Sequence, residues 1–138
     1  MGMRGPAIRA GLRYGFEAFA LGFVLGTFRV TLLVPHVGAL VATAIELPIM
    51  LIVTGWRARV LVGASVALQG AADHAVMGLT AFVLLLLCEL VLAVALGTPP
   101  QQWLADMSRP AGALGLAGQA LFALLPLLLA RKTRVRAG

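Results

Sequence analysis

The sequence is poor in charged residues, in aromatic residues and in cysteine. Charged residues make up 12% of its 138 positions, whereas soluble domains have about a quarter. Aromatic residues make up 7%, and the single cysteine, Cys88, excludes an internal disulfide. A soluble domain of this length has too little interior to hide the apolar side chains that remain. These shortages exclude an ordinary soluble enzyme, a disordered segment and a disulfide-rich scaffold.

Hydrophobic residues are abundant instead, at 61% of the chain. They gather in four stretches, each close to the roughly 20 residues that a helix needs to cross the hydrocarbon layer of a membrane. The sequence therefore predicts a single domain, residues 1–138, that is an all-α integral membrane protein. Its fold is expected to be an antiparallel bundle of four transmembrane helices, with spans near 14–34, 37–55, 75–97 and 111–130.

Turn and interface residues mark the ends of the first two stretches. Pro35 and His36, together with Gly38, indicate a tight turn between these spans. Trp56 and Arg57 indicate the membrane interface after the second span, because an aromatic ring and a cation both favour the headgroup layer.

Two further segments are apolar but shorter. Residues 58–72 either extend the third span or form a short interfacial helix before it. Asp73 and His74 favour a break at this point, because an unpaired aspartate in lipid is costly. Residues 101–110 are expected to lie along the opposite interface.

The basic residues are distributed unevenly. The chain has 11 Lys and Arg against 5 Asp and Glu, a net charge of +6. Because cytoplasmic segments carry an excess of basic residues, four spans place both termini in the cytoplasm. No aromatic residues alternate with the basic ones to stack on bases, so no nucleic-acid partner is expected. The basic residues on the cytoplasmic side are Arg4, Arg9, Arg13, Arg57, Arg59, Arg131, Lys132, Arg134 and Arg136.

The composition also indicates an origin. All basic residues except Lys132 are arginine, and alanine, glycine, leucine and valine are abundant, which is typical of a GC-rich bacterial genome. We therefore expect a multi-pass protein of the bacterial inner membrane, with the lipid bilayer as its first partner.

One strongly polar residue lies inside each predicted span. At 1.5 Å per helical residue, Arg29 lies about 9 Å below the outer surface, Glu46 about 13 Å, and Glu89 and Gln119 about 12 Å. Ionisable groups at this depth normally face the protein interior and have a partner. The sequence therefore predicts a buried polar layer in the outer half of the bundle.

This layer contains one cation and two carboxylates. The planar guanidinium of Arg29 suits paired hydrogen bonds to a carboxylate, so either Glu46 or Glu89 pairs with it and the other is surplus. Gln119 can donate to either carboxylate. Three roles remain open: fixing the register of the helices, binding a proton or cation in a transport path, and catalysis on lipid.

Small residues and prolines predict local features of the spans. Gly22 and Gly26, four residues apart in the first span, are typical of helices that approach closely. Pro48 and Pro126 predict kinks, because proline leaves the carbonyl four residues earlier without its helical donor. In the fourth span this carbonyl belongs to Phe122.

No residue pattern predicts a metal, a cofactor or a catalytic group. His36 and His74 fall on opposite faces of the membrane, and neither has other ligands at metal-binding spacing. The sequence also lacks a phosphate-binding loop and a nucleophile motif.

Three segments resemble a known group of proteins: GFVLGTFRVTLLVPHVGALVATAIELPIML, LLLLCELVLAV and ALFALLPLLLAR. The group comprises small four-helix inner-membrane proteins of proteobacteria. In these, G-[TF]-[IF]-R-V on the first helix precedes E-x-P on the second and a further glutamate on the third. The resemblance covers roughly residues 20–130 and supports the polar layer, but it implies no activity. The matching residues are Gly26, Arg29, Glu46, Pro48, Glu89 and Pro126.

The favoured function is non-catalytic. Because little of the chain lies outside the bilayer, any partner must be met within it or through the short basic tail. The chain is then a self-associating membrane component or an accessory subunit of a larger membrane complex. The polar layer then holds the bundle together. The alternative is an oligomeric proton- or cation-coupled transporter or channel that uses Glu46 or Glu89. A membrane-embedded enzyme that acts on lipid is the third hypothesis.

Overall fold

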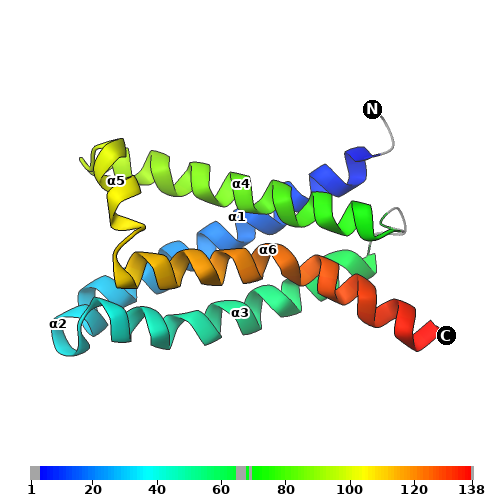
Figure 1. Cartoon of the computed structure of the whole chain (residues 1–138), viewed down its shortest axis with the longest axis horizontal. Helices are drawn as coiled ribbons and strands as arrows, with labels where there is room; N and C mark the ends of the chain where they lie inside the picture. Colours follow the sequence, from blue (N-terminus) through cyan, green and yellow to red (C-terminus); the bar gives the residue numbers. More distant parts are fainter. Residues whose placement is uncertain (1–3, 65–67, 69, 138) are drawn as a thin grey trace.

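The computed structural model describes residues 4–64, 68 and 70–137, which are almost entirely helical and contain no strand. Four long helices lie side by side, and successive ones run in opposite directions (Figure 1). The predicted all-α class and the four apolar helices are confirmed. The helices long and apolar enough to cross a membrane are Gly5–Val37, Ala39–Ala64, Ala71–Ala95 and Pro110–Ala130.

The first long helix begins nine residues before its predicted start near residue 14. It consists of α1 (Gly5–Phe28), the π-helical η2 (Arg29–Leu33) and α2 (Val34–Val37). Pro6 fits the first turn, where its missing N–H is not needed. The early turns form because Ala7 and Gly11 are buried, as is Tyr14.

The first long helix ends at a glycine. Pro35 and His36 do not form the predicted turn but are helical, and the chain turns at Gly38, whose φ is 83°. In a regular α-helix the ring of Pro35 would clash with the carbonyl of Thr31. The wider turn of η2 lies directly before the proline and changes this geometry, so the helix continues past Pro35.

The second long helix, α3 (Ala39–Ala64), runs beyond its predicted end at residue 55. Trp56 and Arg57 lie inside it, as does Pro48. The added turns persist because Ala58 and Leu61 are buried in the core.

The third long helix, α4 (Ala71–Ala95), begins before the predicted break. Asp73 and His74 lie in its first turn, so the break expected there is wrong. An acidic residue suits this position because the helix dipole is positive at its N-terminus. The ring nitrogen Nδ1 of His74 also lies 2.7 Å from the carbonyl oxygen of Gly70. Of the predicted interfacial segment 58–72, residues 65–67 and 69 lie outside the described residues, and the remainder belongs mainly to α3 and α4.

Two further helices complete the chain. A short helix, α5 (Pro100–Asp106), overlaps the segment 101–110 that was predicted at the interface, and Gly97, with φ 95°, turns the chain towards it. The last long helix, α6 (Pro110–Ala137), continues beyond the predicted end at residue 130. The side chains of the predicted basic tail, residues 131–136, lie outside the described part of the structure.

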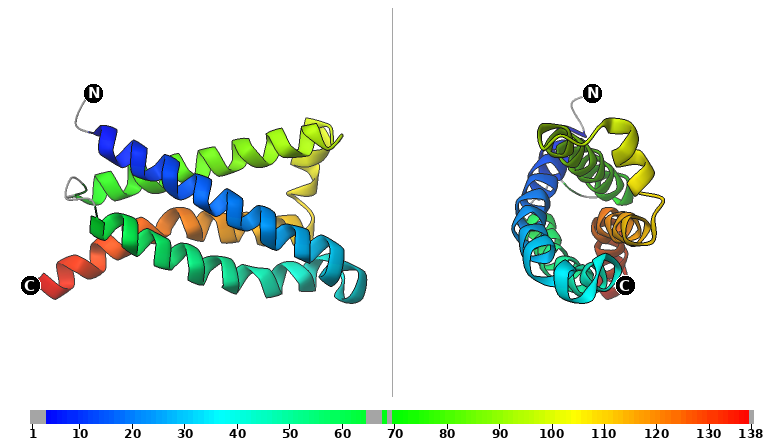
Figure 2. Two further views of the ribbon diagram at one scale, coloured as in Figure 1. Left: turned by 180° about the vertical axis from the view of Figure 1, so that it is seen from behind. Right: turned by 90° about the vertical axis from the view of Figure 1, so that its left-hand side faces the viewer.

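Different segments of the chain lie at the two ends of the molecule. Both termini lie at one end, called the terminal end, and α2 and α5 lie at the other, called the α5 end (Figure 1). Helix α1 contacts α3 and α4, and α6 contacts the same two helices. Viewed along their length, the long helices surround a common centre in the order α1, α3, α6, α4 (Figure 2).

The core lies towards the terminal end. A Cβ atom on Gly11 would lie 2.6 Å from the carbonyl oxygen of Met77, and a Cβ on Gly78 would overlap the carbonyl of Ala123. The backbone of α4 is therefore in direct contact with α1 on one side and with α6 on the other. At the opposite end, η2, α2 and α5 contain no buried residue. The largest fully buried side chains are Tyr14, Met77 and Pro126.

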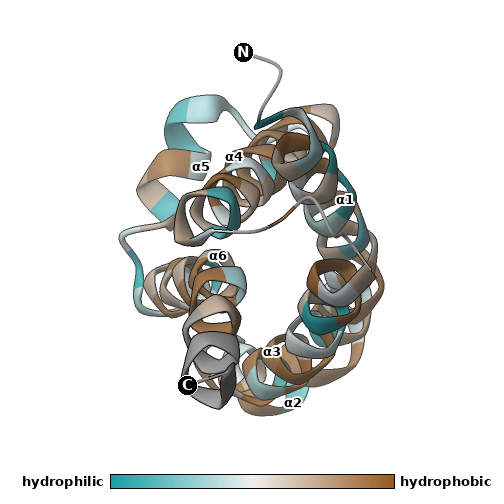
Figure 3. Cartoon of the chain, turned by 90° about the vertical axis from the view of Figure 1, so that its right-hand side faces the viewer, coloured by the Kyte–Doolittle hydropathy of each residue, from teal (hydrophilic) through white to brown (hydrophobic). Residues whose placement is uncertain are grey.

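Large apolar side chains cover the outward faces of the long helices. Each long helix exposes at least one, such as Phe16, Ile52, Leu79 and Leu121. Figure 3 shows the long helices as mostly hydrophobic and α5 with several hydrophilic positions. Apolar surface of this extent is characteristic of proteins that contact a membrane or another protein.

Candidate functional site: a polar cavity between the long helices

A cavity of about 840 Å³ lies between the long helices and extends towards the α5 end. All four long helices and α5 contribute to its walls. Its volume falls within the range of small-molecule sites, about 300–1,000 Å³. The predicted layer therefore surrounds a cavity instead of forming a closed network. All four of its members line the cavity: Arg29, Glu46, Glu89 and Gln119.

Arg29 and Glu46 form an ion pair on one wall. The Nε atom of Arg29 lies 2.5 Å from Oε2 of Glu46, and the two side chains are 30% and 16% exposed. Arg29 is the first residue of η2, and Glu46 lies in α3. The pair thus links the first long helix to the second, and the structure selects Glu46 as the partner that the sequence left open.

Glu89 and Gln119 form the second pair, between α4 and α6. The amide Nε2 of Gln119 donates a hydrogen bond of 2.6 Å to Oε1 of Glu89. This partner is neutral, and Glu89 forms no ion pair with any described residue. Glu89 is therefore the carboxylate that the sequence predicts to be surplus.

Threonine hydroxyls add hydrogen-bond acceptors to the walls. The hydroxyls of Thr27, Thr31 and Thr43 donate to main-chain carbonyls four residues earlier, at 2.7, 2.6 and 2.8 Å. Because a hydroxyl has one hydrogen, each of these oxygens can only accept a hydrogen bond from a molecule in the cavity.

Helix α5 supplies an aromatic ring and a third carboxylate. Trp103 and Asp106 both line the cavity, and Oδ1 of Asp106 lies 3.5 Å from Nε of Arg109. Acidic residues thus outnumber basic ones on the cavity wall by three to one. Asp106 and Glu46 each form an ion pair with an arginine, whereas Glu89 forms none with any described residue.

Gly22 and Gly26 line the cavity and do not make the close helix contact predicted for them. A Cβ on Gly22 would lie 3.7 Å from Cε of Met50, and one on Gly26 would lie 3.8 Å from Nη2 of Arg29. Both are ordinary contacts with flexible side chains. In α1 the close approach to a neighbouring backbone is made by Gly11 and Gly15, nearer the terminal end.

Tyr14 contacts Phe122, which lines the cavity, and its role was not predicted from the sequence. Its hydroxyl donates a 3.0 Å hydrogen bond to the carbonyl oxygen of Phe122, and the two rings stack with centroids 4.2 Å apart. Phe122 is the residue whose carbonyl Pro126 frees. A donor was therefore to be expected, but nothing in the sequence places it on α1.

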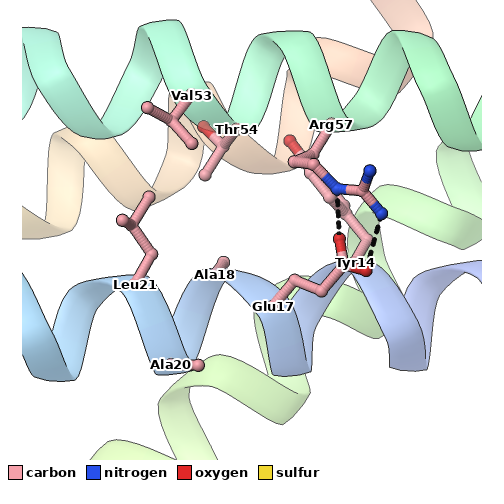
Figure 4. A pocket seen from close by; sticks show the side chains of 8 residues that line it. All are labelled: Tyr14, Glu17, Ala18, Ala20, Leu21, Val53, Thr54 and Arg57. Carbon is pink, nitrogen blue, oxygen red and sulfur yellow. Dashed lines mark hydrogen bonds and ion pairs between the residues drawn. The ribbon is translucent and has the colours of Figure 1, made fainter.

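An ion pair between α1 and α3 was not predicted from the sequence. Arg57 donates from Nε and Nη2 to the two carboxylate oxygens of Glu17, both at 2.7 Å (Figure 4). Arg13 adds a longer contact of 3.2 Å to the same carboxylate. The available signal was an acidic residue early in the first span and a cation late in the second, both near the terminal end.

The remaining ligand-type residues are scattered. His36 lies in α2 and His74 in the first turn of α4, at opposite ends of the molecule. Within residues 4–64, 68 and 70–137, no three His, Cys, Asp or Glu side chains are placed to hold a metal ion. Cys88 is free and half-buried.

A comparison of the chain with protein-family models, curated proteins and solved structures finds no match in any of the three. Any function must therefore be argued from the geometry of the cavity.

Proposed function

We propose that the chain is a small membrane transport protein whose cavity binds a protonated organic amine at Glu89. In this proposal the four long helices cross a bacterial inner membrane, with the terminal end in the cytoplasm and the α5 end outside. The single observation that carries it is Glu89, a carboxylate on the wall of an 840 Å³ cavity whose hydrogen-bond partner is a neutral amide.

The chemistry of the walls supports a cation. A carboxylate that lines a protein cavity and forms no ion pair is stabilised by a proton or by a cationic ligand. The threonine oxygens on the cavity wall can accept hydrogen bonds, which suits the N–H groups of an ammonium ion. Aromatic rings also attract cations, and four line the cavity: Phe19, Phe23, Trp103 and Phe122. The cavity is much larger than a bare metal ion needs.

The direct test is calorimetric titration of the purified, full-length protein with benzylammonium. We expect saturable binding to the wild type and a loss of about 10- to 100-fold in affinity for Glu89→Gln, because a hydrogen bond to a charged group contributes about 1.5–3 kcal/mol. The neutral analogue benzyl alcohol is the control ligand, and it should not distinguish the two proteins.

Glu46→Gln is the matched variant that shows the effect of removing a carboxylate on stability. It leaves Arg29 without its carboxylate, so it should lower the thermal melting temperature more than Glu89→Gln, which keeps an amide partner at Gln119. Absence of benzylammonium binding, or equal binding by the wild type and Glu89→Gln, would contradict the proposal. Uptake of benzylammonium into proteoliposomes should follow the same order as binding.

A non-catalytic role in a homo-oligomer or a larger membrane complex is the second candidate. The observation that favours it is that the Arg29–Glu46 ion pair and the Glu89–Gln119 hydrogen bond each join two helices, as interactions that stabilise a helix bundle do. This role predicts that Arg29→Leu and Glu89→Gln both destabilise the fold and that benzylammonium has no effect. It also predicts a particle larger than one chain when the protein is extracted from native membranes in mild detergent.

A further inference from the structure

A second hollow lies between α1 and α3, and its lining is mainly apolar with charged side chains on one side. It measures about 270 Å³, and Figure 4 shows Ala18 and Leu21 of α1 facing Val53 and Thr54 of α3 across it. Ala18 and Thr54 also line the central cavity, so the two hollows adjoin. Apart from the hydroxyl of Thr54, which donates to its own helix at Met50, these four side chains are apolar.

Charged groups lie at the terminal-end side of this hollow. Glu17 and Arg57 are part of its lining, and Arg13 contacts Glu17. Two guanidinium groups therefore share one carboxylate, which leaves the cluster with one positive charge. Only two nitrogens of Arg57 and one of Arg13 donate to Glu17. Because a guanidinium has five N–H donors, donors remain for an anion.

The position of this cluster matches the membrane interface. Trp56 is exposed, and the guanidinium carbon of Arg57 lies 5.5 Å from the centre of its ring. Exposed tryptophans and arginines are characteristic of the headgroup layer. Arg9 and Arg59, on the same two helices, are exposed as well. Basic residues at this level attract anionic lipids.

We propose that the hollow between α1 and α3 binds an anionic phospholipid. One acyl chain lies against Ala18, Leu21 and Val53, and the phosphate accepts hydrogen bonds from Arg13 and Arg57. A soluble anion would use the arginines but not the apolar hollow, whereas a phospholipid matches both. This inference depends on the membrane insertion proposed above but not on any ligand of the central cavity.

The test uses the full-length protein in an uncharged detergent, titrated with phosphatidylglycerol or with phosphatidylcholine. Native mass spectrometry should show phosphatidylglycerol retained preferentially, and the melting temperature should rise with this lipid alone. Arg13→Gln should weaken the effect about fivefold, since a basic residue near an anionic headgroup contributes about that factor. Val53→Phe should remove it by filling the hollow. Arg109→Gln is the matched control, because it deletes an exposed arginine at the α5 end and should leave the preference for phosphatidylglycerol unchanged.

The outcomes separate this inference from the cation site. Equal effects of the two lipids, an equal loss in Arg109→Gln, or the same stabilisation by inorganic phosphate at millimolar concentration would overturn the lipid site. Benzylammonium binding that fails while phosphatidylglycerol still binds preferentially would overturn the cation proposal only. If Val53→Phe lowers the melting temperature without lipid, Arg13→Gln decides, since it leaves the Glu17–Arg57 pair intact.

Discussion

Pro126 leaves a main-chain carbonyl without its helical donor, and Tyr14 supplies a donor in its place. Proline removes the helical hydrogen bond to the carbonyl of Phe122, and a bare carbonyl is costly where water is absent. The hydroxyl of Tyr14 supplies the missing donor from another helix. The proline in α6 therefore also marks a point of attachment to α1.

Replacing this hydroxyl tests the attachment. We expect Tyr14→Phe to destabilise the protein by about 1–3 kcal/mol, because a buried carbonyl then loses its donor while the ring stacking on Phe122 remains. Chemical denaturation in detergent micelles measures the change. Phe16→Leu is the control on the exposed face of α1, and its stability should equal that of the wild type. A Tyr14→Phe protein as stable as the wild type would show that the hydrogen bond contributes nothing.

Single polar residues could be predicted from the sequence, but their partners could not. Arg29, Glu46, Glu89 and Gln119 stand out because each interrupts an apolar span. The choice of Glu46 over Glu89 depends on which helices are neighbours, which hydropathy does not reveal. For the same reason the Glu17–Arg57 pair was missed: a cation at the end of a span fits the headgroup layer equally well.

Helix boundaries depend on caps and burial more than on hydropathy. The sequence correctly predicted the number and type of the long helices, but each one extends past the apolar stretch at one end or more. Ala7 on α1 and Leu61 on α3 lie in such extensions and are buried. The segment η2 was not predicted, because a π-helical turn has no hydropathy signature. It is explained by Pro35, which cannot follow a regular α-helical turn without a clash.

The close packing of α4 against α6 can be tested with a single substitution. In Gly78→Ala the new Cβ would overlap the carbonyl of Ala123, so one helix must move. We expect a loss of more than about 2 kcal/mol, since overpacking of a rigid backbone is costly. Gly115→Ala on α6 is the matched control, because nothing lies within 4 Å of its added Cβ. It should be neutral or stabilising by up to about 1 kcal/mol through helix propensity. Equal melting temperatures for the two variants would refute this contact.

The whole molecule is packed unevenly from end to end. Its terminal half holds the buried core and the close backbone contacts of α4 with α1 and α6, whereas the other half holds the cavity. Of the elements at the α5 end, η2, α2 and α5 contribute no buried residue. The sequence predicted the polar layer but not this asymmetry, because a cavity arises from the angles between helices.

The proposed orientation is tested by labelling single cysteines. In a Cys88→Ala background, Gln101→Cys lies at the α5 end and Arg59→Cys near the terminal end, and both positions are exposed. With intact bacterial cells, a membrane-impermeant maleimide should label Gln101→Cys. It should reach Arg59→Cys only after permeabilisation. Labelling of both from the same side would refute a membrane-spanning arrangement, and the reverse pattern would invert the orientation.

The uneven packing also determines where a membrane voltage would act. In the proposed orientation, a water-filled cavity would conduct, so the electric field would concentrate across the densely packed terminal half. The full potential contributes about 2.3 kcal/mol per charge at 100 mV, and a cation bound at Glu89 in the proposed transport path would have crossed only a small part of it. Binding is then nearly independent of voltage. The voltage acts on passage beyond the stacked rings of Tyr14 and Phe122, where the field is steepest.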